Sequence, residues 1–285
     1  MPGRLIICAT PIGNLDDATP RLREALAAAD VVFAEDTRRT AKLLRHLGVD
    51  VPQRSFFVGN EDERLPELEM RLAAGETVAL TTDAGTPAVS DPGVTAVQAA
   101  VRTGAAVEVI PGPSAVTTAL AVSGFSADRF VFEGFLPRRG TSRQQRLGSI
   151  AAEERTVVLF VATRRVAGDL ADLAAACGPQ RRVLVARELT KLHEELAWST
   201  LGEAAARWQS DTPRGEYTVV LEPAPPREPD FPAALEQIMR ARATGISLSE
   251  AVREAAQAYQ IRRRALYEAA LDLERKEEGQ GDESR

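Results

Sequence analysis

The sequence is poor in cysteine, histidine and aromatic residues, and each shortage argues against a class of protein. Two cysteines, Cys8 and Cys177, are too few for a disulfide framework, and we expect both to be small buried hydrophobic side chains. Only His46 and His193 are present, far apart in sequence, so no metal site is expected. Aromatic residues make up 5%, which argues against a surface that stacks single-stranded nucleic acid.

Long apolar runs are also missing, and the formal charge is negative. No hydrophobic stretch approaches the length of a membrane span, and the first residues do not form a signal peptide, so we expect a cytoplasmic protein with no membrane partner. A net charge of −6 means that any nucleic-acid partner must be held by local basic patches or by shape. The candidate patches are Arg138-Arg139, Arg143, Arg146 and Arg181-Arg182.

What the sequence does have is a regular alternation of strand-like and helix-like segments. Apolar runs of strand length at 4–10, 31–34, 55–58, 77–81 and 106–110 alternate with amphipathic helical segments, and the pattern begins again after residue 113. This order predicts α/β domains built on mainly parallel sheets. Two closely spaced extended runs, at 194–199 and 217–222, predict that the second sheet is partly antiparallel.

We therefore expect an N-terminal α/β domain at 1–112, a second α/β domain at 113–223, a C-terminal helical region at 231–273 and a disordered tail at 274–285. Ser247-Leu-Ser-Glu250 is a capping box that predicts the start of one of about three short C-terminal helices. The helices around Arg262-Arg-Arg264 are compatible with a DNA-binding helix-turn-helix, but the turn lacks the expected glycine. An appendage for docking or self-association is an equal alternative.

Three loops rich in small residues and proline follow predicted strands of the first domain. They are Thr10-Pro-Ile-Gly-Asn-Leu15, residues 82–93, and Ile110-Pro-Gly-Pro-Ser-Ala115. In open α/β sheets, ligands bind beside the carboxyl ends of strands, where glycine allows a close approach and proline fixes the loop. A single loop of this kind is more simply a turn, whereas three of them favour a ligand site.

The segment Ala34-Glu-Asp-Thr-Arg-Arg-Thr40 lies at another strand-to-helix junction. Glu35 or Asp36 could take a proton or hold a ribose, and Arg38 and Arg39 could meet a phosphate. Alternatively, Asp36 or the neighbouring threonine caps the helix, where an acidic side chain is favourable. The spacing of these residues is compatible with both interpretations.

Seven segments match, in order, the motifs of one known family. They are Ala9–Leu15, Ala34–Arg38, Asp83–Gly93, Ile110–Ala115, Phe132–Pro137, Val185–Lys191 and Arg214–Glu216. One such motif would be weak evidence, but the likeness runs through nearly the whole chain. Together the segments closely resemble the ribosomal RNA small subunit methyltransferase I family, within the tetrapyrrole methylase superfamily.

The resemblance implies two α/β domains of the tetrapyrrole-methylase type, with S-adenosyl-L-methionine bound in the cleft between them, and a homodimer. It also implies 2′-O-methylation of a decoding-centre cytidine in the 16S rRNA of the small ribosomal subunit. By the same analogy, the residues that bind the methyl donor are Pro11, Asp83, Gly85, Thr86, Pro87, Val89, Ser114, Ala115, Val161 and Tyr217.

One segment departs from the family pattern. After the strand at Val157, members of the family typically have Glu-Ser/Ala-Pro-His-Arg, whereas this chain has Val161-Ala-Thr-Arg-Arg165. Any role of the family's glutamate or histidine is then either dispensable or taken by Arg164. The departure bears on substrate detail more than on the fold.

Transfer of a methyl group to a ribose hydroxyl is an in-line displacement that requires alignment and a group to draw off the hydroxyl proton. Asp36 is the candidate base, and Lys191 is the alternative; the chemistry requires no metal. The expected contacts to RNA are Arg38, Arg39, Arg138 and Arg139.

Two other functions remain open. A tetrapyrrole or other small-molecule methyltransferase of the same fold would have a roomy apolar cleft and would not depend on the arginine clusters. A non-catalytic RNA- or DNA-binding assembly factor would act through the C-terminal helices and would bind nucleic acid regardless of S-adenosylmethionine.

Overall fold

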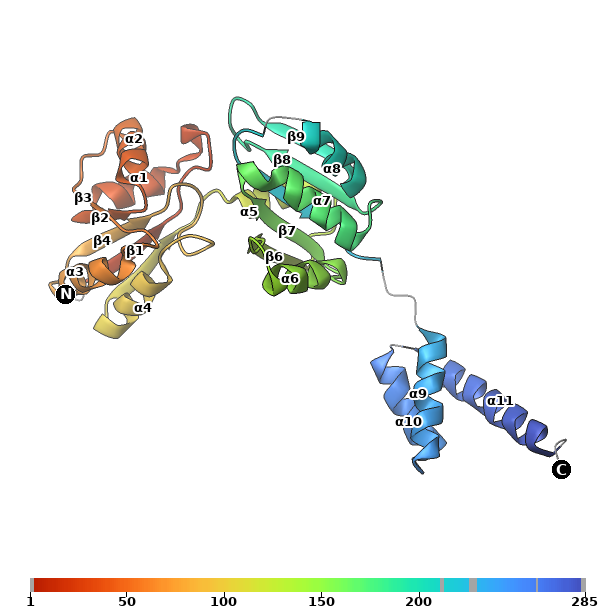
Figure 1. The fold of residues 1–285 in the computed structure, drawn as a ribbon. Coiled ribbons are helices and arrows are strands. Elements are labelled where there is room, and N and C mark those ends of the chain that lie inside the picture. The colour runs from red at the N-terminus through yellow and green to blue at the C-terminus, as the bar shows by residue number, and fades with distance from the viewer. Residues whose placement is uncertain (1–2, 211–212, 226–229, 260, 283–285) are drawn as a thin grey trace. The chain divides into compact units, whose positions relative to one another are not determined.

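The chain forms two β-sheets, each with helices between its strands, followed by a group of helices (Figure 1). This computed structural model describes residues 3–210, 213–225, 230–259 and 261–282. The chain divides into two compact units, Met1–Ala224 and Pro225–Arg285. No helix in the described ranges is both long and apolar enough to cross a membrane.

The first sheet is wholly parallel and has the strand order β3-β2-β4-β1-β5. Its elements are β1 (Arg4–Cys8), η1 (Leu15–Asp17), α1 (Pro20–Ala27), β2 (Val31–Ala34), α2 (Thr37–Leu47), β3 (Gln53–Ser55), α3 (Glu61–Ala73), β4 (Thr77–Thr81), α4 (Val94–Thr103) and β5 (Ala106–Ile110). Cys8 is paired with Thr81 of β4 and with Ile110 of β5. The strands therefore end in register, which brings the three small-residue loops to one edge.

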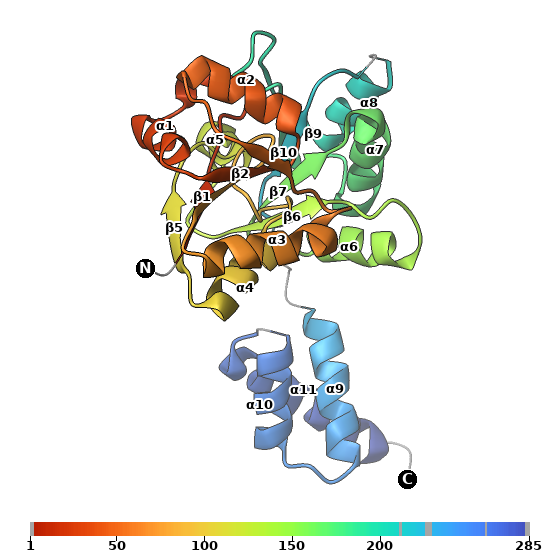
Figure 2. The same ribbon diagram turned by 90° about the vertical axis from the view of Figure 1, so that its left-hand side faces the viewer.

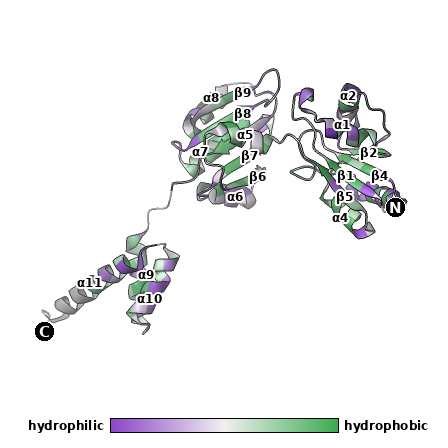
Figure 3. Cartoon of the chain, turned by 180° about the vertical axis from the view of Figure 1, so that it is seen from behind, coloured by the Kyte–Doolittle hydropathy of each residue, from purple (hydrophilic) through white to green (hydrophobic). Residues whose placement is uncertain are grey.

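Buried apolar side chains cover both faces of this sheet. Leu22, Leu26, Leu43 and Leu44 from α1 and α2 pack on one face, and α3 and α4 pack on the other (Figure 2). The hydropathy colouring agrees, because the strands are largely hydrophobic and the hydrophilic residues occur mainly on helices and loops (Figure 3). Such burial on both sides explains why the central strands β1, β2 and β4 are largely apolar, whereas the edge strands β3 and β5 are more polar or exposed.

The strand predicted at 55–58 is wrong, because β3 occupies Gln53–Ser55 and ends where the apolar run begins. The Asn60 side chain accepts a hydrogen bond from the Phe57 amide at 2.7 Å and donates to the Ser55 carbonyl at 3.2 Å. This Asn turn ends the strand. Of the apolar residues in this run, only Phe56 is fully buried. The run is therefore apolar because one of its residues packs in the core, and not because it is a strand.

The second sheet is mixed, as the two extended runs predicted. Its order is β6-β7-β10-β8-β9, and only β6 and β7 are parallel. Its elements are α5 (Ala115–Ser123), β6 (Phe130–Phe135), α6 (Thr141–Ala151), β7 (Thr156–Val161), η2 (Thr163–Arg165), α7 (Val166–Cys177), β8 (Arg182–Arg187), β9 (Glu195–Thr200), α8 (Leu201–Ser210) and β10 (Tyr217–Leu221).

A shared apolar cluster joins the two sheets within Met1–Ala224. Ile12, from the loop after β1, is buried with Leu120 of α5 and with Leu184 and Val220 of the second sheet. Leu189, from the loop after β8, belongs to the same cluster. The loops that follow β1 and β8 are therefore fixed against a common apolar core.

Two of the basic residues expected to offer surface charge are structural instead. Arg143 is almost fully buried and forms ion pairs with Asp169 at 2.7 Å and Asp172 at 2.6 Å. Arg181 is also buried and donates to three backbone carbonyls, including that of Ile150. Buried guanidinium groups need such partners, and neither residue can meet a phosphate without losing them.

The C-terminal unit contains α9 (Phe231–Ala243), α10 (Leu248–Ala258) and α11 (Arg263–Asp282) around its own apolar core. The Ser247 side chain accepts from the Glu250 amide, which confirms the predicted start of α10. The third helix continues to Asp282, so residues 274–282 of the predicted disordered tail are helical. The glutamate, lysine and arginine of this segment are good helix formers even without apolar neighbours. Residues 283–285 lie outside the described residues.

Candidate active site

Two adjoining cavities lie where the strands of the first sheet end. The larger has a volume of about 460 Å³, which is in the range of small-molecule sites, and the smaller has about 270 Å³. The residues common to both walls are Ile12, Arg39, Asp83, Ala84 and Glu216. These shared residues mark the place where molecules bound in the two cavities would meet.

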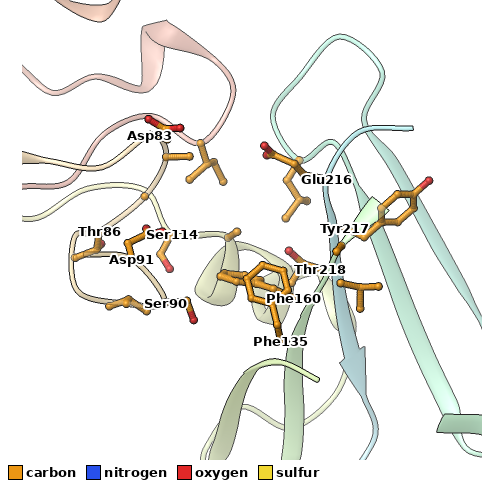
Figure 4. A pocket seen from close by; sticks show the side chains of 18 of the residues that line it. Asp83, Thr86, Ser90, Asp91, Ser114, Phe135, Phe160, Glu216, Tyr217 and Thr218 are labelled. Atoms are coloured by element: carbon orange, nitrogen blue, oxygen red, sulfur yellow. The ribbon is translucent and has the colours of Figure 1, made fainter. Parts of the chain in front are cut away.

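The larger cavity is enclosed by loops of the first sheet on one side and by strands of the second on the other (Figure 4). The loop at 82–93 is tied to the loop after β1, because Thr10 and Gly85 exchange backbone hydrogen bonds of 2.8 and 3.1 Å. Ala88 and Ser90 of this loop have φ values of 70° and 63°, an uncommon conformation for residues with a side chain. Such local strain concentrates at functional sites.

Carboxylates dominate the polar wall of the larger cavity. Glu35 accepts from the Thr82 hydroxyl at 2.6 Å and from the Asp83 amide at 3.1 Å. Burial and the nearby Glu35 raise the pKa of Asp83. Burial likewise raises the pKa of Asp91 to about 6, with smaller contributions from Glu35 and Asp83 and an opposing hydrogen bond with Thr82. The cavity is therefore built to receive positive charge.

The opposite wall is apolar. Phe135 of β6 and Phe160 of β7 lie with ring centroids 5.6 Å apart, and Phe135 is 54% exposed (Figure 4). Tyr217 also borders the cavity, but its ring packs edge-on against Trp208 in the core at 5.4 Å. A flat apolar group could therefore pack against the phenylalanines, whereas Tyr217 contributes mainly its backbone.

Most of the residues predicted to bind the methyl donor gather around this larger cavity. Those that line it are Asp83, Gly85, Thr86, Val89, Ser114, Ala115, Val161 and Tyr217. Pro11 lines the smaller cavity instead, and the buried Pro87 lines neither. Eight of the ten residues predicted for the donor site therefore lie around one cavity, and Asp83 lies on the wall that this cavity shares with the smaller one.

The geometry does not favour Asp36 as a base. Its carboxylate accepts hydrogen bonds from the amide, Nε and Nη2 of Arg38, at 2.8, 3.1 and 2.7 Å. The hydrogen bonds with Arg38 lower the pKa of Asp36 to about 2, and the residue lines neither cavity. It is the N-cap of α2, and its own amide donates to Asp83 at 3.0 Å. The capping interpretation therefore describes Asp36 better.

Lys191 lines the smaller cavity and is held between two carboxylates. Its Nζ lies 2.8 Å from Glu188 and 2.9 Å from Glu216. Burial tends to lower the pKa of Lys191, but its hydrogen bonds with these two residues outweigh that effect and raise it. Lys191 is therefore a protonated, fixed cation at neutral pH, and it cannot take a proton from a hydroxyl.

The four arginines predicted to contact RNA have different surroundings. Arg39 lines both cavities and lies 3.4 Å from Asp83. Arg38 is committed to Asp36. Arg138 and Arg139 are exposed and line neither cavity, and their side chains make no ion pair or hydrogen bond with the residues that the structure describes.

The departure at Val161-Ala-Thr-Arg-Arg165 falls partly inside the site. Val161 and the next two residues border the larger cavity. Arg165 pairs with Asp169 at 3.1 Å and donates to the Arg138 carbonyl. Arg164 is exposed and borders neither cavity, so the structure does not place it where it could replace the family's histidine.

The sequence reasoning missed several residues of the site. Phe135, Phe160 and Lys42 belong to no glycine-rich loop, and only the register of the sheets and the first turns of α2 bring them to the cavities. Asp91 lies within the recognised loop at 82–93, but its burial next to Glu35 follows from the tertiary fold. The position of Asp91 in a loop rich in glycine and proline was the sequence feature that could have identified it as a site residue.

Comparison with known proteins agrees with this architecture. Residues 4–205 match the family model described as Tetrapyrrole (Corrin/Porphyrin) Methylases, and residues 229–274 match the RsmI C-terminal HTH domain. A glycine is therefore not needed between α10 and α11 for this helix-turn-helix match. Among solved structures, uroporphyrin-III C-methyl transferase from Thermus thermophilus, complexed with S-adenyl homocysteine, has a TM-score of 0.54 at 19% identity and covers 76% of this chain and 96% of that chain.

Two relatives match over almost their whole length. The ribosomal RNA small subunit methyltransferase I of Synechocystis sp. is 44% identical over 95% of this chain and 99% of its own. The protein of the same name from Mycobacterium tuberculosis is 43% identical over 97% of this chain and 98% of its own. The chain therefore belongs to the ribosomal RNA small subunit methyltransferase I family of tetrapyrrole-methylase-fold enzymes.

Proposed function

We propose that this protein transfers the methyl group of S-adenosyl-L-methionine to the ribose 2′-hydroxyl of a decoding-centre cytidine in 16S rRNA of the small ribosomal subunit. The observation that carries the proposal is the pair of adjoining cavities that share a wall at Asp83. The names of the relatives support an RNA acceptor. Ribosomal subunits are assembled in the cytoplasm, where we infer that the protein acts.

The residues of the larger cavity fit the proposed donor. Four carboxylates and one guanidinium line it, which suits a molecule that carries a sulfonium and an ammonium group. The phenylalanines Phe135 and Phe160 offer an apolar face for an adenine ring. At the start of α5, Ser114 makes no capping hydrogen bond with its own side chain, and the free amides there would suit the donor's carboxylate. The donor, when bound, supplies an electrophilic methyl group.

Within this proposal, Asp83 is the group that draws off the 2′-proton. Its carboxylate lies on the wall common to both cavities, whereas Asp36 borders neither. The raised pKa of Asp83 makes it a stronger base than Asp36, whose pKa is lowered. The Asp36 amide and Arg39 fix the Asp83 carboxylate, so the fold aims it before the acceptor arrives.

Lys191 then acts as a fixed charge rather than as a base. Glu188 and Thr190, which precede it in the same loop, have φ values of 52° and 65°, so the loop is held in an unfavourable conformation. Glu188 also accepts from the Glu216 amide at 2.9 Å. These contacts fix the ammonium group beside the wall where the hydroxyl oxygen would develop negative charge.

Donor binding should weaken as the pH falls through the pKa of Asp91, which is about 6. Below that pH the carboxyl is protonated, so the cavity loses one negative charge that favours a cationic ligand. Between pH 7.5 and pH 5, calorimetry with S-adenosylmethionine in the absence of RNA should show a loss of affinity of up to about tenfold.

The Asp91→Asn variant is the control for this pH effect, because the titration of the donor itself is common to both proteins. At pH 7.5 the variant should already bind weakly, and its affinity should change less with pH than that of the wild type. The same pH dependence in both proteins would remove Asp91 from donor binding.

The proposed function itself is tested by supplying labelled S-adenosylmethionine with three acceptors: under-methylated small subunits, the same subunits after methylation, and uroporphyrinogen. The label should enter the RNA of the under-methylated subunits only. Transfer to the tetrapyrrole, with none to RNA, would instead support a small-molecule methyltransferase of this fold. RNA binding with no transfer to any acceptor would support a non-catalytic assembly factor.

We also propose that the protein is a homodimer. β5 is an edge strand, and together with α4 it exposes Val94, Val101, Val107 and Val109, each 45–68% accessible. A patch of this kind on a soluble protein favours an interface. Light scattering at micromolar concentration should give twice the chain mass of 30.7 kDa, and replacement of Val107 by lysine should shift the population toward the monomer. A fully active wild-type monomer would contradict the proposal.

A further inference from the structure

The two cavities differ in charge. Four carboxylates and one guanidinium line the larger cavity, whereas three cationic groups and two carboxylates line the smaller. The three cations are Arg39, Lys42 and Lys191. Neighbouring cavities of opposite character suit two ligands of opposite charge that react with each other.

From this contrast we infer that the smaller cavity is an anion subsite that holds the backbone phosphate next to the target ribose, with Lys42 and Arg39 as its ligands. The inference rests on the proposed function, because it assigns a second substrate group to the same site. It explains how an acidic chain can bind an RNA backbone without a broad basic surface.

Lys42 is the cation whose role is otherwise unexplained. It lies in the second turn of α2, is exposed, and lines the smaller cavity. Within the described part of the chain its ammonium group has no ion pair or hydrogen bond, whereas the Arg38 guanidinium on the same helix donates two hydrogen bonds to Asp36. A lysine without a partner at a cavity wall has its donors available for a ligand.

The other polar groups of the smaller cavity are already satisfied. The Thr10 hydroxyl donates to the Thr82 carbonyl at 3.1 Å, and the Thr82 hydroxyl donates to Glu35. Thr40 is paired with Thr81 at 3.3 Å. The Lys191 ammonium group already contacts Glu188 at 2.8 Å and Glu216 at 2.9 Å. The donors that remain belong to Lys42 and to the Arg39 guanidinium, whose Nε lies 3.4 Å from Asp83 and which carries further N–H donors. Cationic donors of this kind favour an anion over a neutral base or sugar.

The backbone of the loop after β1 forms part of this cavity. A Cβ on Gly13 would lie 2.5 Å from Lys191 Cγ and 2.8 Å from the Leu189 carbonyl oxygen, so a side chain does not fit there. The Asn14 amide donates to Thr190 at 3.1 Å and fixes the same contact. The loop and Lys191 therefore form a rigid wall opposite α2, as a site for a small, compact anion requires.

The test compares Lys42→Gln with Arg45→Gln. Arg45 lies on the same helix, is also exposed, carries the same charge and lines neither cavity. The ratio kcat/KM for under-methylated small subunits is measured between about 50 and 200 mM KCl. Lys42→Gln should lower it severalfold and should reduce the slope of its logarithm against log[KCl] by about 0.7–1, because one phosphate contact is lost. Arg45→Gln should keep the wild-type slope.

Two further measurements separate this inference from the proposed function. Donor affinity, measured by calorimetry without RNA, should be equal in the wild type and both variants. Cytidine 5′-monophosphate should bind the donor-loaded wild type more tightly than cytidine, and Lys42→Gln should lose that preference.

If small subunits are not methylated at all, the proposed function fails, and the nucleotide preference alone decides whether the cavity takes a phosphate. If small subunits are methylated but Lys42→Gln has the slope and the nucleotide preference of Arg45→Gln, the inference is wrong while the proposed function stands.

Discussion

Replacement of Asp83 by asparagine should lower the single-turnover rate of methyl transfer by about 10²–10⁴-fold, the usual effect of losing a group that moves a proton. Asparagine keeps an oxygen that can accept the Asp36 amide, so the loop at 82–93 should retain its conformation. It has no negative charge and cannot accept the 2′-proton. The rate is measured at saturating donor, because Asp83 also borders the donor cavity and a change in donor affinity must not enter the result.

The matched variant is Asp36→Asn, on the adjacent strand end. Asparagine caps a helix nearly as well as aspartate, so stability should change by about 1 kcal/mol at most, and the rate should stay close to that of the wild type. The opposite pattern, with Asp36→Asn slow and Asp83→Asn fast, would show that the shared wall is not where the proton is removed.

Assembled small subunits should be methylated about 10²-fold faster than naked 16S rRNA at equal concentration, which is the loss that a misplacement of about 1 Å can cause. The protein is acidic, and few of its cations in the described part of the chain are free near the cavities. Electrostatic attraction therefore contributes little to the binding of free RNA. Alignment of the reacting groups depends instead on an acceptor whose shape is already formed.

This comparison is made with subunits and deproteinised RNA from the same preparation, followed by separation of the labelled RNA. Readdition of ribosomal proteins to the naked RNA should restore the rate. Equal rates on subunits and naked RNA would show that local sequence, and not the shape of the particle, selects the acceptor.

Much of the fold could be predicted from the sequence, because its central strands are buried on both faces. Val31–Ala34 and Thr77–Thr81 are strands at the predicted residues and are almost wholly buried. Ala106–Ile110 is also a strand as predicted, although it lies at the sheet edge, contains Glu108 and is mostly exposed. The prediction of individual elements failed where apolar residues and secondary structure do not coincide. Phe56 is buried after its strand has ended, and the last helix extends through a segment without an apolar stripe.

The candidate site was predictable in position but not in the roles of its residues. Register brings the ends of parallel strands to one edge, so the loops after β1, β4 and β5 had to be neighbours. Whether Asp36 or Asp83 faces a cavity depends on side-chain direction and on which arginine each one meets. The role of Arg143 could not be predicted from the sequence for the same reason. Its burial against Asp169 depends on the packing of α6 on α7.

The position of the transferred methyl group decides whether this protein is a ribose methyltransferase. Under-methylated small subunits are incubated with the protein and labelled S-adenosylmethionine, and the RNA is digested with nucleases of known specificity and analysed by mass spectrometry. We expect one methyl group on the ribose of a single decoding-centre cytidine, with the adjacent phosphodiester resistant to alkali because its 2′-oxygen is blocked. A methyl group on a base, or label found only in protein or in a small molecule, would contradict the account.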